Sequence, residues 1–419
     1  MGRTAVPRLL AAALLLAFTA PGWAVPPKSK GCVRKGKSLA NIEARAVARC
    51  GDARGCTLRQ QKQLARLATG YADKCVALNE VQVLGSHNSY HIEPKPDLMA
   101  ALLALLPIFE QIQYTHLPLD QQFETQGIRQ VEIDVWADPQ GGLYSQRKAL
   151  IEIGQDPVSH LPELDQPGFK VLHILDVDFE TTCLTFKGCL QTIKTWSDAH
   201  PHHMPIMIQI EAKDDATPDI FGLGFAIPPK IGTPEFDALD AEIRSVFPPE
   251  RLITPDDVRR GASTLEYAVK NFGWPTLGAA RGKVLFTLDN EGKRTAYLAG
   301  HPNLAGRVLF TNANPGDPDA AFVKRNDPIG DTDIPQLVAA GYVVRTRSDA
   351  DTLEARAGNT GPRDAALASG AQWVSTDYEA PDPRFGTGYF VEIPGGMPAR
   401  CNPVNGPPGC RAFAIERLP

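Results

Sequence analysis

The stretch VQVLGSHNSYH at residues 81–91 decides how this chain folds. A short β-branched run ends abruptly in polar groups, and the pattern returns in QVEIDVW at 130–136 and PIMIQIE at 205–211. Apolar residues that alternate over about 4–8 positions predict strands with a buried face. These stretches therefore predict buried strands whose carboxyl ends carry reactive side chains.

Eight such stretches follow one another along the chain. They predict strands at 82–87, 130–136, 169–175, 205–211, 283–288, 307–311, 342–347 and 372–376. Helical spacing between them predicts helices at 97–106, 190–200, 236–247, 292–300, 334–341 and 363–369. Eight alternating units favour a parallel (β/α)₈ TIM-type barrel of the α/β class over an open sheet. Residues 322–325 are a further strand candidate that can replace one of the later strands.

The composition excludes several classes of protein. The chain has 419 residues, 43% of them apolar, and a formal net charge of −5. These values exclude a disordered chain, a multi-span membrane protein and a nucleic-acid binder driven by bulk charge. No protein partner is evident from the sequence.

Residues 1–24 have the features of an export signal. Arg3 and Arg8 precede an apolar run at 9–20, and Gly22 and Ala24 supply the small residues of a cleavage site. A membrane-spanning helix needs about 20 apolar residues, which is more than this run contains. We expect cleavage after Ala24 and a soluble mature protein that is periplasmic or secreted.

The cysteines agree with export, because all eight follow the signal and an even number in an oxidising compartment predicts four disulfides. They fall into three groups: Cys32, Cys50, Cys56 and Cys75; Cys183 and Cys189; Cys401 and Cys410. The last two groups are expected to pair locally, and the first allows three connectivities. Helical spacing over 38–50 and 58–75 predicts an antiparallel hairpin, which would bring Cys32 near Cys75 and Cys50 near Cys56. Zinc is the alternative, but no CxxC pair exists.

Charge separates the hairpin from the rest of the chain. Residues 25–80 contain twelve Lys/Arg and four Asp/Glu, a net charge of +8, whereas the remainder from residue 81 is strongly acidic. We expect a Cys-rich helical hairpin at 25–80, a barrel at 81–385 and a disulfide-closed cap at 386–419. The basic face of the hairpin is a candidate contact for anionic lipid headgroups.

Side chains able to do chemistry end the first four predicted strands: His87 and Asn88, then Glu132 and Asp134, then His173, then Glu211. In a barrel of this type, chemistry gathers at the carboxyl ends of the strands. Period-two geometry places Glu132 and Asp134 on one face of their strand, where two buried carboxylates require a cation or a proton. Together with Glu211 and the Asn88 amide they form an oxygen-only set, which suits Ca²⁺ better than Zn²⁺.

These motifs resemble a known family. SHNSY after the first strand, VEIDVW, a histidine on the third strand and IQIEAKD are similar to the catalytic half of phosphatidylinositol-specific phospholipase C. VLHILDVDFETTC, ASGAQWVSTDY and the RCNPV tail resemble its calcium-dependent bacterial branch, so the likeness runs from about residue 81 to the C-terminus.

The resemblance implies a role for each matching residue. His87 and His173 match the catalytic histidines that flank the phosphodiester, and Asn88, Glu132, Asp134 and Glu211 match the calcium ligands. Lys324, Arg345 and Arg347, near later strand ends, are expected to contact the headgroup. We expect His173 to act as general acid, His87 to hydrogen-bond the phosphoryl oxygen, and a calcium-bound carboxylate or a histidine to activate the ring hydroxyl. His91 lies on the following loop, and we expect its loss to cost much less.

The expected activity is calcium-dependent cleavage of phosphatidylinositol-type lipids to diacylglycerol and a cyclic inositol phosphate, with contact to a membrane surface. Two alternatives remain open. Glycerophosphodiester phosphodiesterases share the barrel and the paired histidines but have His-Arg where this chain has His87-Asn88. A barrel that binds phospholipid headgroups without catalysis is the alternative of another class. Release of cyclic inositol phosphate rather than glycerol phosphate would distinguish the three.

Overall fold

A computed structural model describes residues 30–50 and 56–416, without the side chains of residues 47, 49 and 50. Its centre is a barrel of parallel strands in the order β5-β4-β3-β2-β1-β8-β7-β6, which one bridge between Asn312 and Phe322 closes at β5 and β6. The strands are β1 (Val81–Ser86), β2 (Gln130–Trp136), β3 (Ile206–Lys213), β4 (Val284–Leu288), β5 (Leu309–Thr311), β6 (Phe322–Lys324), β7 (Val343–Arg347) and β8 (Trp373–Thr376). The expected (β/α)₈ barrel is confirmed.

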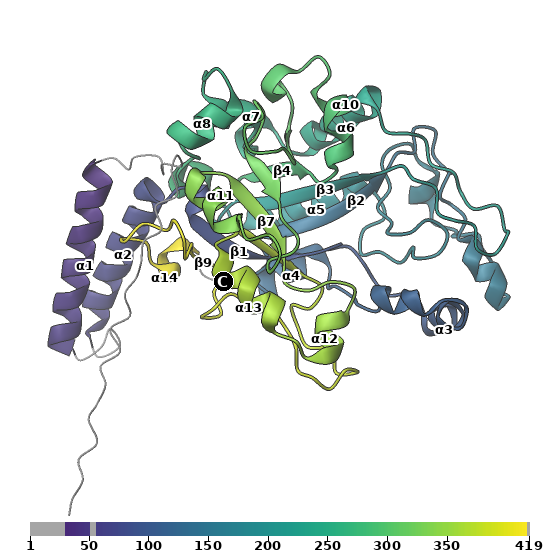
Figure 1. The fold of residues 1–419 in the computed structure, drawn as a ribbon, viewed down its shortest axis with the longest axis horizontal. Helices are drawn as coiled ribbons and strands as arrows, with labels where there is room; N and C mark the ends of the chain where they lie inside the picture. The colour runs from purple at the N-terminus through teal and green to yellow at the C-terminus, as the bar shows by residue number, and fades with distance from the viewer. Residues whose placement is uncertain (1–29, 51–55, 417–419) are drawn as a thin grey trace, which may run out of the picture.

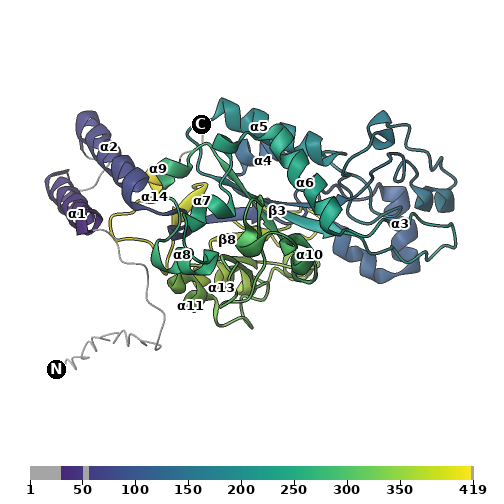
Figure 2. The ribbon, with the colours of Figure 1, turned by 90° about the horizontal axis from the view of Figure 1, so that it is seen from above.

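Helices cover the outside of the barrel (Figures 1 and 2). Those from the first half of the barrel are α3 (Pro96–Leu105), α4 (Leu119–Thr125), α5 (Phe186–Ala199) and α6 (Thr233–Val246). Those from the second half are α7 (Pro255–Arg259), α8 (Leu265–Asn271), α9 (Leu277–Ala280), α10 (Arg294–Leu298), α11 (Ile334–Ala340), α12 (Leu353–Ala357) and α13 (Gly361–Ser369). In α5, Leu190, Ile193 and Trp196 turn an apolar stripe toward the strands. The exception is α3, which lies beyond the barrel and packs in a second core (Figure 1).

One predicted strand is wrong. Residues 169–175 form no strand, and the eighth barrel strand is instead β6, which lies within the alternative at 322–325. The apolar residues of 169–175 are buried all the same, because Leu172 and Leu175 pack in a second core with Trp136 and residues of α3. A short apolar run cannot by itself distinguish a barrel strand from a loop with its own core.

The residues between β2 and α5 therefore form a long insertion at the carboxyl end of the barrel. Isolated β-bridges hold this insertion in place. Lys170 pairs with both Trp136 and Thr185, and Ile174 pairs with Asp178. The Cys183–Cys189 disulfide closes its last turn.

The N-terminal hairpin consists of α1 (Lys30–Cys50) and α2 (Leu58–Cys75), joined by the Cys32–Cys75 disulfide. Thr57 begins α2 with a capping box to Gln60. The expected Cys50–Cys56 bridge falls outside the described residues, because it requires the Cys50 side chain. Figure 1 shows both helices beside the amino-terminal ends of the strands, at the opposite end of the molecule from α3. No helix within 30–50 and 56–416 has the length and apolar content of a membrane span.

The C-terminal segment returns to the same end of the barrel. Strand β9 (Ala399–Cys401) pairs antiparallel with the first half of β1, and the Cys401–Cys410 disulfide leads to α14 (Ala412–Ile415), which packs on α2. Farther along β1, Gly85 lies opposite Gln130 of β2, where a Cβ would meet the Gln130 side chain at 1.8 Å. This close approach leaves the carboxyl end of β1 pressed against β2.

Candidate active site

The polar side chains that end β1, β2 and β3 meet at the carboxyl end of the barrel. Parallel pairing sets Glu132 of β2 level with Gln209 of β3, and Asp134 level with Glu211. The SHNSY segment is tied to β2, since the Ser89 hydroxyl accepts from the Glu132 N–H at 2.8 Å and the Ser89 N–H donates to the Glu132 carbonyl at 2.9 Å. Strand register and this tie thus bring the predicted residues of the first two strands together.

His87 directly follows β1 and is held by β8. Its Nδ1 lies 2.8 Å from Oδ1 of Asp377, the residue after β8, and its backbone N–H donates to the Thr376 carbonyl at 2.9 Å. Burial and the nearby Arg347 guanidinium lower the pKa of His87 well below its usual value. The ring is therefore neutral near neutral pH. With Nδ1–H donated to a carboxylate, its Nε2 presents a lone pair.

His173 is held differently, by a tight turn of the insertion. Asp176 takes a positive φ of 64°, and Asp178 comes back so that its Oδ2 lies 2.7 Å from Nδ1 of His173. Burial and the Lys213 ammonium lower the pKa of His173 to about 4. His173 is therefore also neutral near neutral pH, and a role as general acid requires it to take up a proton first.

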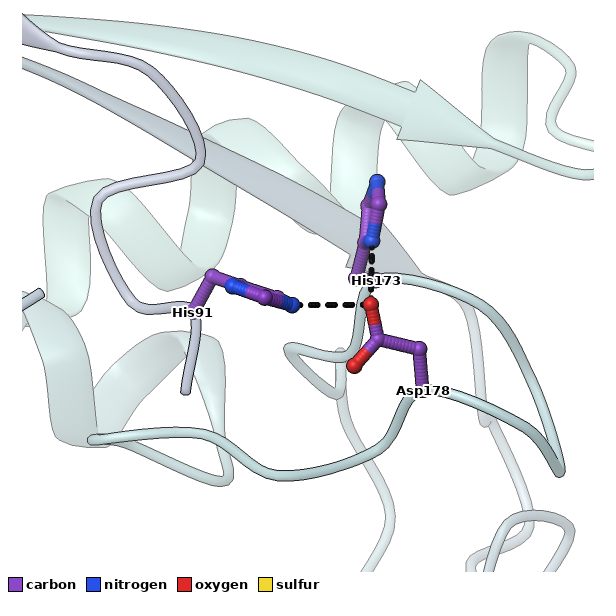
Figure 3. A group of neighbouring side chains, drawn as sticks. All are labelled: His91, His173 and Asp178. Atoms are coloured by element: carbon purple, nitrogen blue, oxygen red, sulfur yellow. Dashed lines mark hydrogen bonds and ion pairs between the residues drawn. The ribbon is translucent and has the colours of Figure 1, made fainter. Parts of the chain in front are cut away.

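His91 follows the end of β1, as expected, and its side chain contacts the same carboxylate as His173. Its side chain is completely buried, and its Nε2 lies 2.8 Å from the same Oδ2 of Asp178 that binds His173. Figure 3 shows the two rings approaching one carboxylate oxygen from different directions. Replacing His91 is therefore expected to disturb His173.

Glu132, Asp134 and Glu211 form an acidic cluster in which one oxygen of each lies within 4.8 Å of the others. Two cations share this cluster: Arg345 donates to Oε2 of Glu132 at 2.6 Å, and the Lys213 ammonium lies 2.6 Å from Oδ2 of Asp134. Burial still outweighs these cations, raising the pKa of Glu132 to about 7 and that of Asp134 well above its usual range. The cluster therefore has more buried negative charge than its own side chains compensate.

The donor atoms of this cluster fit a hard cation. Oδ1 of Asn88 and Oδ1 of Asp134 are buried with no hydrogen-bond partner among the described residues, although such atoms normally have one. A φ of 45° at Asn88 and the hydrogen bond from its Nδ2 to the Tyr114 hydroxyl fix the amide, leaving Oδ1 as the atom available to a ligand. Carboxylate and amide oxygens without nitrogen or sulfur suit Ca²⁺.

Comparison with known proteins agrees with this chemistry. The model of a family described as phosphoinositide phospholipase C, Ca²⁺-dependent, matches residues 76–403. The chain belongs to this family. Its enzymes are phosphoric diester hydrolases that act on phosphoinositides and depend on calcium. A search of the curated proteins finds no match.

Two solved structures are similar in overall course. A calcium-dependent phosphoinositol-specific phospholipase C from a Gram-negative Pseudomonas species has 18% identity and a TM-score of 0.48, over 79% of this chain and 96% of that one. A Ca²⁺-dependent phosphatidylinositol-specific phospholipase C from Streptomyces antibioticus has 19% identity and a TM-score of 0.45, over 75% and 97%.

The three basic residues expected to contact the headgroup differ in their burial and in their hydrogen-bond partners in this phospholipase C barrel. Arg345 is fully buried, and its guanidinium donates to Ser375, Asn326 and Glu132, so it supports the acidic cluster. Arg347 ends β7 and donates to Asp377 at 3.1 Å, with its side chain 15% exposed. Lys324 ends β6 beside Asp289 and is 25% exposed. Arg347 and Lys324 therefore reach solvent at the barrel mouth.

Sequence reasoning missed three residues of this phospholipase C site: Asp377, Asp178 and Lys213. Asp377 follows β8, so the rule that chemistry gathers at strand ends could have found it. Lys213 shares the face of Glu211 by period two, a signal that was present in IQIEAKD. Asp178 lies in the motif VLHILDVDFETTC, but its contact with His173 depends on the turn in the insertion, which the motif does not reveal.

Proposed function

We propose that this chain cleaves phosphatidylinositol-type lipids to diacylglycerol and a cyclic inositol phosphate, with His87 and His173 as catalytic residues. One observation carries the proposal: two neutral histidines, each oriented through Nδ1 by its own carboxylate, lie at the same barrel end as an oxygen-only acidic cluster.

In this proposal, Asn88, Glu132, Asp134 and Glu211 hold Ca²⁺. When bound, the ion supplies a Lewis acid for a phosphate oxygen and lowers the pKa of the inositol hydroxyl beside it. Arg345 and Lys213 each hold one oxygen of a buried carboxylate, Oε2 of Glu132 and Oδ2 of Asp134. This arrangement fixes both side chains and leaves Oε1 of Glu132 and Oδ1 of Asp134 for the ion.

The histidines then move the proton. Nε2 of neutral His87 carries a lone pair, so it does not donate the expected hydrogen bond to the phosphoryl oxygen and is suited instead to accept the proton of the attacking ring hydroxyl. His173 takes up a proton when the anionic phosphodiester lies beside it, because a nearby negative charge raises a histidine pKa. It then donates this proton to the diacylglycerol oxygen as the ester bond breaks. Arg347, at the end of β7, is the proposed headgroup contact, with Lys324 beyond it.

We further propose that the loops around the barrel mouth contact the lipid surface. Large apolar side chains are exposed on the loops after β1, β2 and β3, most of all Ile108 at 61% and Ile227 at 75%. The others are Leu105, Leu106, Leu117, Leu143, Ile151, Val158 and Ile220. The basic hairpin lies at the other end of the barrel and is therefore not part of this contact.

We propose a signal peptide at 1–24, a hairpin at 25–80, a catalytic barrel at 81–385 and a cap at 386–419, in a periplasmic or secreted enzyme. Disulfides of the kind found between Cys32 and Cys75 are typical of an oxidising compartment, which supports export. Sequencing the N-terminus of the secreted or periplasmic protein tests cleavage after Ala24.

The activity is tested by following the products by phosphorus NMR. The enzyme is incubated with phosphatidylinositol vesicles in Ca²⁺, in EGTA, and in EGTA followed by excess Ca²⁺. We expect cyclic inositol phosphate with Ca²⁺, none with EGTA, and recovery on readdition. Release of glycerol phosphate from glycerophosphoinositol would identify a glycerophosphodiester phosphodiesterase, and vesicle binding without any product would identify a binding protein.

A further inference from the structure

The two helices of the N-terminal hairpin contain two carboxylates, and both fasten the hairpin to the rest of the chain. Glu43 is the acidic residue of α1, and its Oε2 accepts from the Arg411 guanidinium of the C-terminal segment at 2.8 Å. Asp73 is the acidic residue of α2, and its Oδ1 accepts from Arg281, which follows α9, at 2.7 Å. The lysines and arginines of the hairpin are therefore not neutralised by carboxylates of their own helices.

These lysines and arginines form a stripe along each helix. Most of them recur at steps of three, four or eight residues, a spacing that places side chains on one helical face. Their side chains are exposed, and none pairs with a carboxylate in the part of the chain that the structure describes. Like charges three or four residues apart weaken a helix, so the stripes favour an external anionic partner. The residues are Lys30, Arg34, Lys35, Lys37 and Arg45 on α1, and Arg59, Lys62, Arg66 and Lys74 on α2.

Apolar side chains lie among the cations. Val33 on α1 is 47% exposed, and Leu58 at the start of α2 is 66% exposed. A groove of about 310 Å³ between the two helices combines both kinds of side chain, since its lining includes Leu39, Ile42, Leu67, Lys35, Arg66 and Lys74. The surface of the hairpin is thus cationic and apolar at once.

This combination fits a lipid surface with anionic headgroups better than it fits a nucleic acid. Helices that lie in a membrane interface have Lys and Arg on one face and bury apolar side chains at the level of the headgroups. Proteins that bind single-stranded nucleic acid offer aromatic rings for base stacking, whereas Tyr71, the one aromatic residue of α1 and α2, is buried. Phosphatidylinositol is itself an anionic lipid, so the surface on which the proposed function acts has the required charge.

The hairpin and the barrel mouth face away from each other. The buried residues of α2 are Ala68, Tyr71, Ala72 and Cys75, which belong to the main core, so the exposed cations of this helix point outward. Figures 1 and 2 show the hairpin at one end of the molecule and α3 at the other. One flat bilayer cannot contact both ends at once.

We propose that the hairpin is a second lipid-binding surface, which takes an anionic bilayer opposite the one at the mouth, so that one enzyme molecule holds two lipid surfaces together. The inference rests on the proposed function for the lipid contact of the mouth. The charge of the hairpin does not depend on catalysis.

The size of the effect follows from the number of cations. Each Lys or Arg close to an anionic membrane surface strengthens binding about fivefold, so neutralising four of them should weaken the hairpin contact by about a hundredfold or more. Salt should weaken it as well. Raising the ionic strength from about 0.1 M to about 1 M shortens the screening length from about 10 Å to about 3 Å, whereas the apolar contact at the mouth is not screened.

The test mixes donor-labelled and acceptor-labelled vesicles of phosphatidylcholine and phosphatidylglycerol with the full-length enzyme in EGTA, and measures energy transfer between the vesicles as tethering. The wild-type enzyme should tether these vesicles, and should not tether vesicles of phosphatidylcholine alone. The variant Arg34→Gln/Lys37→Gln/Lys62→Gln/Arg66→Gln should lose tethering but still sediment with single vesicles, to which the mouth binds. Gln has nearly the helix propensity of Lys and Arg, and circular dichroism checks the fold.

The matched control changes the same four positions and keeps their charge. Arg34→Lys/Lys37→Arg/Lys62→Arg/Arg66→Lys should tether vesicles as the wild type does. The proposal is overturned if the wild type does not tether anionic vesicles, if it tethers phosphatidylcholine vesicles equally well, or if the Gln variant tethers at the wild-type level. A double-stranded DNA that displaces vesicles from the wild-type hairpin would identify nucleic acid as the partner instead, and would also overturn it.

A variant at the mouth tests whether two ends are needed. Ile108→Ser/Ile227→Ser should lose tethering while keeping salt-sensitive binding to single anionic vesicles through the hairpin. Tethering that survived this variant would contradict the two-ended arrangement. The catalytic proposal fails separately: tethering without cleavage of phosphatidylinositol in Ca²⁺ would remove the catalytic assignment and keep the hairpin contact, whereas cleavage without tethering would do the reverse.

Discussion

The two histidines proposed as catalytic share one site but are supported by different parts of the molecule. His87 is supported by the barrel itself, since it follows β1, its N–H binds β8, and its partner Asp377 follows β8. His173 is supported by an insertion, and its partner Asp178 lies only five residues further along the same loop. Closure of the barrel positions the first pair automatically. The second pair depends on a turn and on the contacts made by His91.

The largest expected effect does not depend on this difference. His87→Ala and His173→Ala should each lower kcat by about 10²–10⁴-fold, the usual contribution of a general acid or base. Calcium affinity should remain within a few-fold of wild type, because neither residue is a proposed ligand. The control is His160→Ala, whose ring is 72% exposed and pairs only with Asp156. Near-normal turnover by His173→Ala would show that the insertion contributes no catalytic residue.

Replacing the carboxylates that orient the two histidines should show that His87 and His173 are supported to different degrees. Asp178→Asn is expected to lower kcat by about 10²-fold, whereas Asp377→Asn should cost about tenfold, both within the range of positioning effects. The reason is that β1 and β8 still hold the backbone of His87 when Asp377 changes. Steady-state kinetics of the two variants, with circular dichroism as the folding check, measures the gap. Equal losses would mean that the two supports are equally rigid.

The pH dependence of stability should also report His173. Its folded pKa of about 4 lies below the usual value of 6.5, so between these values the unfolded chain binds a proton that the folded protein does not. Wild-type stability therefore falls as the pH falls through this window. His173→Gln lacks this group, and its stability relative to wild type should rise by about 2 kcal/mol from pH 7 to pH 5. Urea unfolding at both pH values measures it, and a constant difference would contradict the lowered pKa.

The smallest expected effect concerns the disulfides. The Cys183→Ser/Cys189→Ser pair should lower kcat by less than tenfold, because this bridge closes the end of the insertion near Thr181. The matched pair Cys401→Ser/Cys410→Ser lies at the far end of the barrel and should lower the unfolding temperature without changing kcat. Unchanged kcat without the Cys183–Cys189 disulfide, together with a lowered kcat without the Cys401–Cys410 disulfide, would show that the insertion does not need its disulfide.

The difference between the supports also explains what could be predicted from sequence. Glu132, Asp134 and Glu211 were predictable because the period of two along a strand fixes which side chains share a face. The register of β2 and β3 then places Asp134 opposite Glu211. His173 was found by its motif but assigned to a strand that does not exist. Its apolar neighbours Leu172 and Leu175 are buried in a loop core, which leaves the same pattern in the sequence as a strand.

Partnerships across the sequence were beyond reach. His87 meets Asp377 after a separation of 290 residues, and Glu132 meets Arg345 after 213. Only the closed barrel brings these pairs together. A single sequence does not show which charged side chain will pair with which. The burial of His91 against Asp178 was not predictable for the same reason, since it depends on the fold of the insertion.

The central claim is that the two differently supported histidines act together on one phosphodiester. The most direct test is a double-mutant cycle of His87→Ala and His173→Ala, measured as release of cyclic inositol phosphate from phosphatidylinositol with saturating Ca²⁺. Groups that act as a unit are strongly non-additive, so the double variant should be within about tenfold of the poorer single variant. Losses that multiply in full would show that the two histidines act in separate steps, and would contradict the account.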